Sequence, residues 1–453
     1  MTKRINNLAS FIVGTTFEEL PLELVEKAKR HILDTFGATL AGASSDIFKA
    51  ARDVLLFQEG SGKSALWGTP DRASPRNAAL LNGIAAHALE LDDAGGCDHS
   101  GAVVLPAVMA AVDATERNLD GKELLVAVVI GYEVGRRVLE ACGGYAPHNG
   151  AGWHSTATCG VFGAAAACAR VLGLSQEETR NALGIAGSFS GGLWAFIHDG
   201  SLTKKLHTGR AAEGGLLAAL LAQQGITGPS RIFDDVWGGF LKTIAGDEAV
   251  PAALDETLGQ IWKLARCMIK PYASCRGTHS AIDAIGLLMA ELSVTADDIE
   301  LVSVEMCGFL KDMCGSASVE TMAVAQMSLP YALAARLTFG HAGLDAYEDK
   351  ARRDPAIAHW LSRIQVKVND ALRKDGEPIV TVRTRDGRES SLCVEIALGA
   401  PSNPLSDEAL LEKYSNLSNR VLEPTRAKEL SDICMRLEHL SSVKEISLLL
   451  ASA

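Results

Sequence analysis

The sequence predicts a mainly α protein, in which a large all-helical domain contains an inserted, smaller α+β domain. Apolar residues recur at helical spacing through about residue 265, and they alternate with polar residues at period two in several segments after residue 268. Helical spacing returns after about residue 400. We therefore expect a helical domain from residues 1–267 and 401–453, and an α+β domain from residues 268–400. A chain of 453 residues is long enough to bury both cores.

The first long helix is expected in residues 20–42. Pro21 suits a first helical turn, and Gly37 indicates a weakening end. The apolar positions at helical spacing are Leu22, Val25, Ala28, Ile32, Leu33 and Phe36.

Two further segments, 120–144 and 155–188, have the same helical spacing. Within the second, Ser175 can cap a new helix and Glu178 can complete a capping box. Many alanine and glycine positions in these segments let helix axes approach closely, so we expect a compact helical bundle with short loops.

The α+β domain is predicted from three alternating segments, LVSVEM, IQVKVND and IVTVRTRDGRESSLCVEIALG. Asp386 and Gly387 separate two alternating runs and predict a hairpin. Ser406 then caps a helix that opens with two acids. We expect the tail that follows to rejoin the first domain.

Composition excludes several classes of protein. A net charge of -12 argues against nucleic acid as the main partner, because phosphate binding needs a basic face. Ten scattered cysteines without a C-x-x-C pair indicate reduced thiols. The N-terminal apolar run is only FIV, and no apolar stretch approaches 18 residues, so we expect a cytoplasmic protein with no membrane contact.

An acidic loop in residues 90–99 is the first candidate site. It contains Glu90, Asp92, Asp93 and Asp98, and ends at His99. The spacing DD-x4-D could bind a magnesium diphosphate, but no second Asp-rich motif is present and aromatic residues are only 5%. Zinc is less favoured, because these groups are bunched in one loop. A general acid/base site or a solvated helix end remain open.

Two cation-bearing segments follow. The first has Lys204, Lys205 and His207 before an Ala-rich helix, which is typical of an anion site but also of a solvated basic turn. The second lies at the interdomain junction, where ligand clefts commonly form. Its candidate residues are Lys270, Ser274, Cys275, Arg276 and His279. The four-residue spacing of Cys275 and His279 is not that of a cysteine hydrolase.

Five segments together resemble the MmgE/PrpD family. They are HALELDDAGGCDHSGAVVLPAV, GWHSTATCGVFGAAAACARVLGLSQEETRNALGIAGS, LTKKLHTGRAAEGG, KPYASCRGTH and AQMSLPYALA. The family includes 2-methylcitrate dehydratases, cis-aconitate decarboxylases and iminodisuccinate epimerases. The resemblance implies a large helical domain with a smaller α+β lid domain, a homodimer, and no metal or organic cofactor.

The resemblance also implies the site residues. Those carried over by motif are His99, His154, Lys204, Lys270 and Tyr331, and we add Glu90 as a further catalytic candidate. Candidate substrate-binding residues are Lys205, His207, Ser274, Cys275 and Arg276. Three positions in the acidic loop depart from the family pattern: Glu90 replaces an Asp, Ala94 a Thr, and Ser100 follows His99 without a proline. Cys275 stands where the decarboxylases have a His, which favours another activity.

We therefore expect a cofactor-independent lyase that removes a proton next to a carboxylate, most like a 2-methylcitrate dehydratase. A cis-aconitate decarboxylase or an iminodisuccinate epimerase is the alternative, with a magnesium-dependent diphosphate enzyme or an inactive binding protein more distant. Lysines would bind the substrate carboxylates. His99 and His154 would transfer protons near their usual pKa of roughly 6.5, and Tyr331 would donate to a leaving hydroxyl or a carboxylate.

Overall fold

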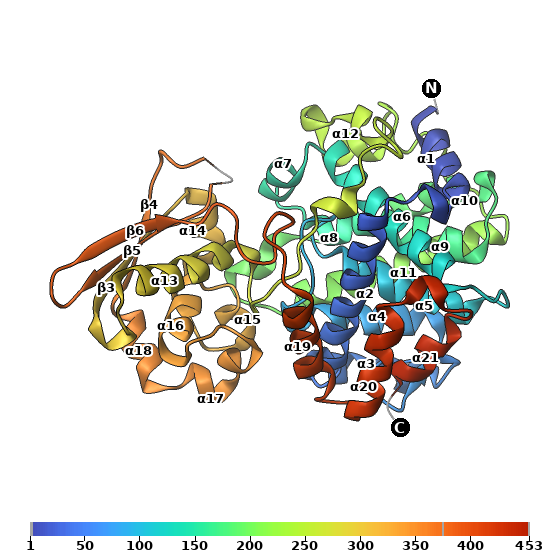
Figure 1. Ribbon diagram of the computed structural model, residues 1–453. Helices are drawn as coiled ribbons and strands as arrows, with labels where there is room; N and C mark the ends of the chain where they lie inside the picture. The colour runs from blue at the N-terminus through green and yellow to red at the C-terminus, as the bar shows by residue number, and fades with distance from the viewer. Residues whose placement is uncertain (1–2, 374–375, 452–453) are drawn as a thin grey trace.

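The computed structural model describes residues 3–373 and 376–451, and it is mainly helical (Figure 1). The helices of the larger body are α1 (Lys3–Gly14), α2 (Leu22–Gly42), α3 (Asp46–Glu59), α4 (Pro75–His87), α5 (Ser100–Ala114), α6 (Gly121–Ala141), α7 (Tyr145–Gly150), α8 (Ser155–Thr158), α9 (Gly160–Leu172), α10 (Gln176–Ala186), α11 (Thr203–Gln223) and α12 (Phe240–Ile244). A short antiparallel pair, β1 (Ser64–Ala65) and β2 (Arg72–Ala73), lies between α3 and α4.

Helices α4, α5, α9 and α11 form the centre of this body and pack closely on one another. Small residues allow the approach: a Cβ added at Gly83 of α4 would lie 2.7 Å from Cα of Gly209 on α11. The Ser175–Glu178 capping box at the start of α10 is confirmed. These contacts fix the starts of α5 and α11, which carry the basic and imidazole side chains described below.

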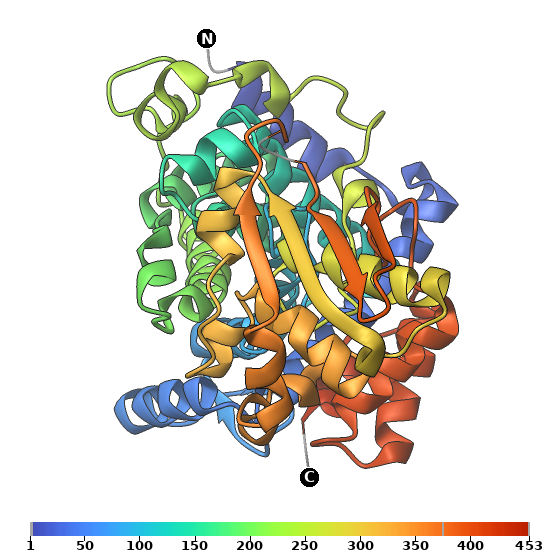
Figure 2. The same ribbon diagram turned by 90° about the vertical axis from the view of Figure 1, so that its left-hand side faces the viewer.

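The smaller body is built on a four-stranded sheet in the order β4-β3-β5-β6 (Figure 2). Its strands are β3 (Ile299–Met306), β4 (Ile364–Val368), β5 (Ile379–Thr384) and β6 (Glu389–Cys393). β3 is parallel to β4 and antiparallel to β5. The predicted hairpin is confirmed: β5 pairs with β6 around Gly387, whose φ is 88°.

Helices cover one face of this sheet, and the other face is more exposed (Figure 2). α13 contacts β5 and β6, and α16 contacts β4. The helices of this body are α13 (His279–Leu292), α14 (Gly308–Cys314), α15 (Met322–Ala325), α16 (Leu329–Phe339), α17 (Asp349–Arg352) and α18 (Pro355–Leu361).

The chain ends with helices packed on the larger body. These are α19 (Asp407–Ser418), α20 (Pro424–Cys434) and α21 (Lys444–Leu450), and Figure 1 shows them beside α2. Ser406 caps α19 as predicted, accepting from the Ala409 amide. The prediction that Gly37 weakens a helix end is wrong: Gly37 is buried inside α2, where a Cβ would lie 3.2 Å from the Tyr414 ring of α19. The glycine serves helix–helix contact.

In the described part of the chain, one helical stretch has the length and hydropathy of a membrane span, Ser155–Leu172. The expectation that no apolar stretch approaches 18 residues is therefore wrong. Of this stretch, 94% is buried within the fold, because α9 is surrounded by α5, α6 and α11. Its apolar character is explained by its central place in the bundle.

Candidate active site

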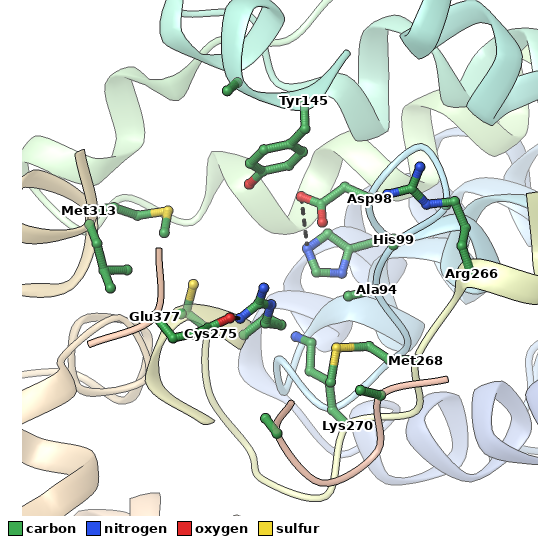
Figure 3. A pocket seen from close by; sticks show the side chains of 18 of the residues that line it. Ala94, Asp98, His99, Tyr145, Arg266, Met268, Lys270, Cys275, Met313 and Glu377 are labelled. Atoms are coloured by element: carbon green, nitrogen blue, oxygen red, sulfur yellow. Dashed lines mark hydrogen bonds and ion pairs between the residues drawn. The ribbon is translucent and has the colours of Figure 1, made fainter. Parts of the chain in front are cut away.

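A cavity of about 560 Å³ lies where the two bodies meet. Figure 3 shows side chains from both bodies pointing into it. Its walls come from the acidic loop, the start of α11, and the segments 266–277, 309–313, 376–377 and 395–402. Six of the residues predicted from sequence line it: Glu90, His99, Lys204, Lys270, Cys275 and Arg276.

Glu90 is buried in the wall of the cavity and contacts three lysines. Lys204 donates a hydrogen bond to Oε1, and Lys205 Nζ lies 2.7 Å from the same atom. Lys270 Nζ lies 2.9 Å from the Glu90 carbonyl oxygen and 3.4 Å from Oε2. Glu90 has a left-handed backbone, with φ of 54°, which is uncommon for a residue with a side chain. The turn after α4 therefore brings its carboxylate to the lysines of α11.

These contacts move the pKa values of the groups involved. Burial alone would raise the pKa of Glu90, but the three lysines hold it well below the usual value. Burial opposes charge on Lys204, yet the Glu90 carboxylate raises its pKa. Lys205 is different, because burial outweighs its contact with Glu90 and lowers its pKa to about 8. Near neutral pH the cluster carries a net positive charge.

His99 is the imidazole that reaches the cavity. Its Nδ1 lies 2.9 Å from Asp92 Oδ2 and 3.1 Å from the Asp93 carbonyl oxygen. Both neighbours are acceptors, so Nδ1 carries the proton of the neutral ring and Nε2 has the free lone pair. Burial lowers the pKa of His99, but Asp92 and Asp98 outweigh it and raise the pKa above its usual value. His99 can therefore give or take a proton at Nε2.

The other acids of the loop have separate partners. Asp92 Oδ1 lies 2.9 Å from Nδ1 of His87, and His87 and His99 together hold the pKa of Asp92 well below its usual value despite burial. Asp93 accepts from the Tyr132 hydroxyl at 2.6 Å and from the Gly101 amide at 2.9 Å. The carboxylates of Asp92 and Asp93 are thus directed at different groups, which counts against the magnesium-diphosphate alternative.

Asp98 lines the cavity beside His99. It belongs to the acidic loop, but it was not among the predicted site residues. Its Oδ2 lies 3.6 Å from His99 Nε2 and 3.9 Å from His154 Nε2. A φ of 108° places Asp98 in a strained backbone conformation. Figure 3 shows the Tyr145 hydroxyl pointing toward it. Burial and the charge of Asp98 raise the pKa of Tyr145 well above its usual value, so this hydroxyl stays a donor.

His154 and His207 lie behind this wall. Their Nδ1 atoms are 2.8 Å apart, and the rings of Trp194 and Phe196 pack against His154. Burial and the neighbouring cations hold the pKa of His154 well below its usual value, and burial with Lys204 lowers that of His207 to about 4. His154 therefore remains neutral and contacts Asp98 instead of lining the cavity.

Five of the predicted residues do not line the cavity: Lys205, His154 and His207, which are described above, and Tyr331 and Ser274. Tyr331 is fully buried in the smaller body, where its hydroxyl donates to the Ala346 carbonyl at 2.5 Å. The role predicted for it is corrected to packing, because its donor is used within the fold. Ser274 is also buried, and its hydroxyl lies 2.8 Å from that of Thr278.

Cys275 lines the cavity, and its expected neighbour His279 does not face it, because His279 Nε2 lies 3.3 Å from the Ser274 carbonyl. A hydrogen bond from the Cys314 thiol and the charge of Lys204 outweigh burial and lower the pKa of Cys275 to about 6. Arg276 lines the cavity but is paired with Glu377.

Two arginines of the lining were also missed, Arg136 from α6 and Arg266 from the segment before Lys270. Arg136 stands beside Arg137 in an ordinary helical segment and Arg266 stands apart from the other candidate residues, so neither formed a motif. Tyr145, at the start of α7, was missed for the same reason.

Among the described residues, two triads at the site have donor atoms within 4.8 Å of one another: His87–Asp92–His99 and Asp98–His99–His154. The triads share His99 but use its two different ring nitrogens, Nδ1 toward Asp92 and Nε2 toward Asp98. In the first, the carboxylate faces the Nδ1 atoms of both imidazoles, an arrangement that also orients and polarises the rings without an ion.

Fold and site define a mainly helical protein whose cationic cavity, at the junction with a small α+β body, contains an imidazole positioned for proton transfer. The chain belongs to the MmgE/PrpD family. The family's N-terminal domain matches residues 6–252 and its C-terminal domain matches residues 272–439.

Three relatives of this chain have cis-aconitate decarboxylase in their names. The chain is 29% identical to the cis-aconitate decarboxylase-like protein oryM of Aspergillus oryzae, over 98% of this chain and 96% of that protein. It is 29% identical to a cis-aconitate decarboxylase of Aspergillus terreus, over 95% of this chain and 92% of that protein. It is 28% identical to the cis-aconitate decarboxylase of Homo sapiens, over 98% of this chain and 94% of that protein.

Proposed function

We propose that this protein is a cofactor-independent enzyme that decarboxylates a small unsaturated tricarboxylate of the cis-aconitate type. The observation that carries the proposal is the position of His99 Nε2 in a cavity shared with Lys204 and Lys270. The names of the relatives favour this reaction over the dehydration expected from the sequence.

The charge of the cavity suits a polyanion. Three ammonium groups contact one carboxylate at Glu90, which leaves an excess of positive charge in a buried wall. A bound carboxylate would compensate that excess, and a fixed cation aimed at a developing negative charge lowers the barrier by about 3 kcal/mol. Lys204 and Lys270 are the two of these lysines that reach the cavity.

The reaction needs a proton donor at carbon. The bond from the CH2 carbon to one carboxylate breaks, and its electron pair forms the new double bond as CO2 leaves. The pair of the original double bond moves to the carbon beside the far carboxylate, where an enolate-like charge develops. Protonated His99 donates its Nε2 proton to that carbon, and its raised pKa keeps the donor form populated near neutral pH.

Dehydration of a 2-methylcitrate-type substrate is the second candidate, and Cys275 favours it. This position lines the cavity, and the family resemblance implies an imidazole there in decarboxylases. In dehydration neutral His99 would remove the proton next to a carboxylate, and Tyr145 would donate to the leaving hydroxyl. The same cations would stabilise the charge in either reaction.

A substrate panel tests both candidates. EDTA-treated protein is incubated with cis-aconitate, 2-methylcitrate, citrate and iminodisuccinate in deuterated water, and products are followed by NMR. Decarboxylation predicts loss of cis-aconitate with one deuteron at the carbon that is protonated. Turnover of 2-methylcitrate alone would assign the dehydratase, deuterium uptake without net conversion would indicate epimerase chemistry, and no change in any substrate would contradict the proposal.

A further inference from the structure

A second carboxylate near the cavity is surrounded by cations in the same way as Glu90. Glu140, near the end of α6, has Arg136 Nε at 2.9 Å and Arg266 Nη1 at 3.2 Å from Oε1, and Lys263 Nζ at 2.7 Å from Oε2. Burial alone would raise the pKa of Glu140, but Lys263 and Arg136 lower it, so the carboxylate is charged. One negative charge therefore faces three positive ones.

Two of these cations belong to the cavity. Arg136 and Arg266 line it, whereas Lys263 lies outside the lining. Arg136 is only 7% exposed, and its Nη1 also donates to the Gly96 carbonyl at 3.3 Å, in the loop that leads to His99. Burial and the charge of Arg136 both lower the pKa of Arg266, whereas Glu140 acts in the opposite direction.

The two clusters lie on different sides of His99. In Figure 3 the Lys270 ammonium and the Arg266 guanidinium are at opposite sides of the His99 ring. Ala94 pairs with Met268 through both backbone hydrogen bonds, so the acidic loop is fixed to the segment between Arg266 and Lys270. A ligand beside His99 thus has positive charge toward both ends.

We propose that Arg136 and Arg266 form a second carboxylate subsite, which selects a tricarboxylate over a dicarboxylate. Two carboxylates would lie toward the lysines of the Glu90 cluster, and the third would lie toward the guanidinium groups, whose planar N–H pairs match a carboxylate. The inference rests on the proposed function, because it assumes a polycarboxylate in this cavity.

A structural role for the same cluster makes a different prediction. If the ion pairs of Glu140 only fasten α6 to residues 263–266, Lys263 and Arg266 are equivalent for ligand binding. If the subsite exists, only the cavity-lining cations matter. Lys263→Gln is therefore the matched control, since it removes one charge from the same carboxylate outside the cavity lining.

The test is calorimetric titration of the full-length protein with propane-1,2,3-tricarboxylate and with succinate, which lacks one CH2–carboxylate arm. Arg266→Gln is expected to weaken tricarboxylate binding roughly 10-fold, equivalent to the loss of one good ionic contact, with less than a 3-fold effect on succinate. Lys263→Gln is expected to change either affinity less than 3-fold. Lys270→Gln is expected to weaken both ligands.

Equal losses in Arg266→Gln and Lys263→Gln would overturn the subsite, as would a wild-type protein that binds the tricarboxylate no tighter than succinate. Binding is measured without turnover, so the result separates the two proposals. If Lys270→Gln weakens both ligands and Arg266→Gln weakens neither, the subsite fails and the polycarboxylate cavity stands. If the wild-type protein binds neither ligand, both proposals fail.

Discussion

Oδ2 of Asp92 lies 2.9 Å from Nδ1 of His99, and neither group is exposed to solvent beyond a few per cent. The carboxylate fixes the ring orientation and favours its protonated form, while Nε2 faces the cavity. Asp92 therefore acts on the reaction through His99, and His99 is the group whose titration should appear in the pH dependence.

Asp92→Asn is expected to move that titration to lower pH. The negative charge of Asp92 raises the pKa of His99, so its removal lowers this pKa. In decarboxylation His99 acts as an acid, and kcat/KM falls as the pH rises through its pKa. In dehydration His99 acts as a base, and kcat/KM rises over the same interval. The measurement is kcat/KM as a function of pH for the wild type and for Asp92→Asn, which shows whether the falling or the rising limb moves. An identical pH profile for the two proteins would contradict the effect of Asp92 on the pKa of His99.

His99→Asn is expected to reduce kcat on the order of 100-fold or more, because general acid or base catalysis commonly contributes that much. Circular dichroism and the thermal midpoint check that the variant is folded. His359→Asn is the matched control, since His359 is exposed on α18 and does not line the cavity. Full turnover in a folded His99→Asn protein would remove His99 from the mechanism.

Glu90→Gln is expected to destabilise the fold. Removing one partner of a buried ion pair costs about 3 kcal/mol or more, and here three lysines lose their common partner. The pKa of Glu90 is lowered in the folded state, so its stabilisation is present above the usual pKa of about 4.3 and is lost as the pH falls further. Urea unfolding of both proteins at pH 7 and at acidic pH measures this difference. Equal stability at pH 7 would refute the expectation.

The helices, the hairpin and the identity of the cationic segments were predictable from sequence because each depends on local pattern. The capping box at Ser175 and the turn at Gly387 depend only on neighbouring residues. The place of Gly37 was not predictable, since its role depends on Tyr414, which is distant in sequence. Helical spacing also did not reveal that Ser155–Leu172 is 94% buried within the fold.

The site was predicted in part for the same reason. Glu90, His99, Lys204 and Lys270 belong to dense motifs, and the fold brings them together. Tyr331 also belongs to a motif, but the facing of its side chain is set by packing in the smaller body. Arg136 and Arg266 are far apart in sequence, and only the three-dimensional structure brings them together at Glu140.

Cys275 is expected to be alkylated quickly by iodoacetamide at pH 7. The lowered pKa of Cys275 increases its thiolate fraction near neutral pH, whereas burial and neighbouring acids raise the pKa of the exposed Cys393. Peptide mapping by mass spectrometry should show Cys275 reacting roughly 10-fold faster, with its rate falling as the pH is lowered. In Cys314→Ala the main donor to Cys275 is lost, so the reaction at pH 7 slows. A faster reaction at Cys393 would contradict the assignment.

Replacing Tyr331 and Tyr145 by phenylalanine separately distinguishes a hydroxyl that stabilises the fold from one that acts in the reaction. Tyr331→Phe leaves the buried Ala346 carbonyl without its donor, which costs about 1–3 kcal/mol of stability, and kcat should be unchanged because Tyr331 lies outside the cavity lining. Tyr145→Phe removes a hydroxyl that points toward Asp98 in the cavity, and it should lower kcat/KM about 10-fold or more with little change in unfolding. Urea unfolding and steady-state kinetics on both variants give a crossed pattern if these assignments hold. If Tyr331→Phe is instead normally stable and kinetically defective, the Tyr331 hydroxyl acts in the reaction. A hydroxyl whose only role is its bond to the Ala346 carbonyl would not produce that result.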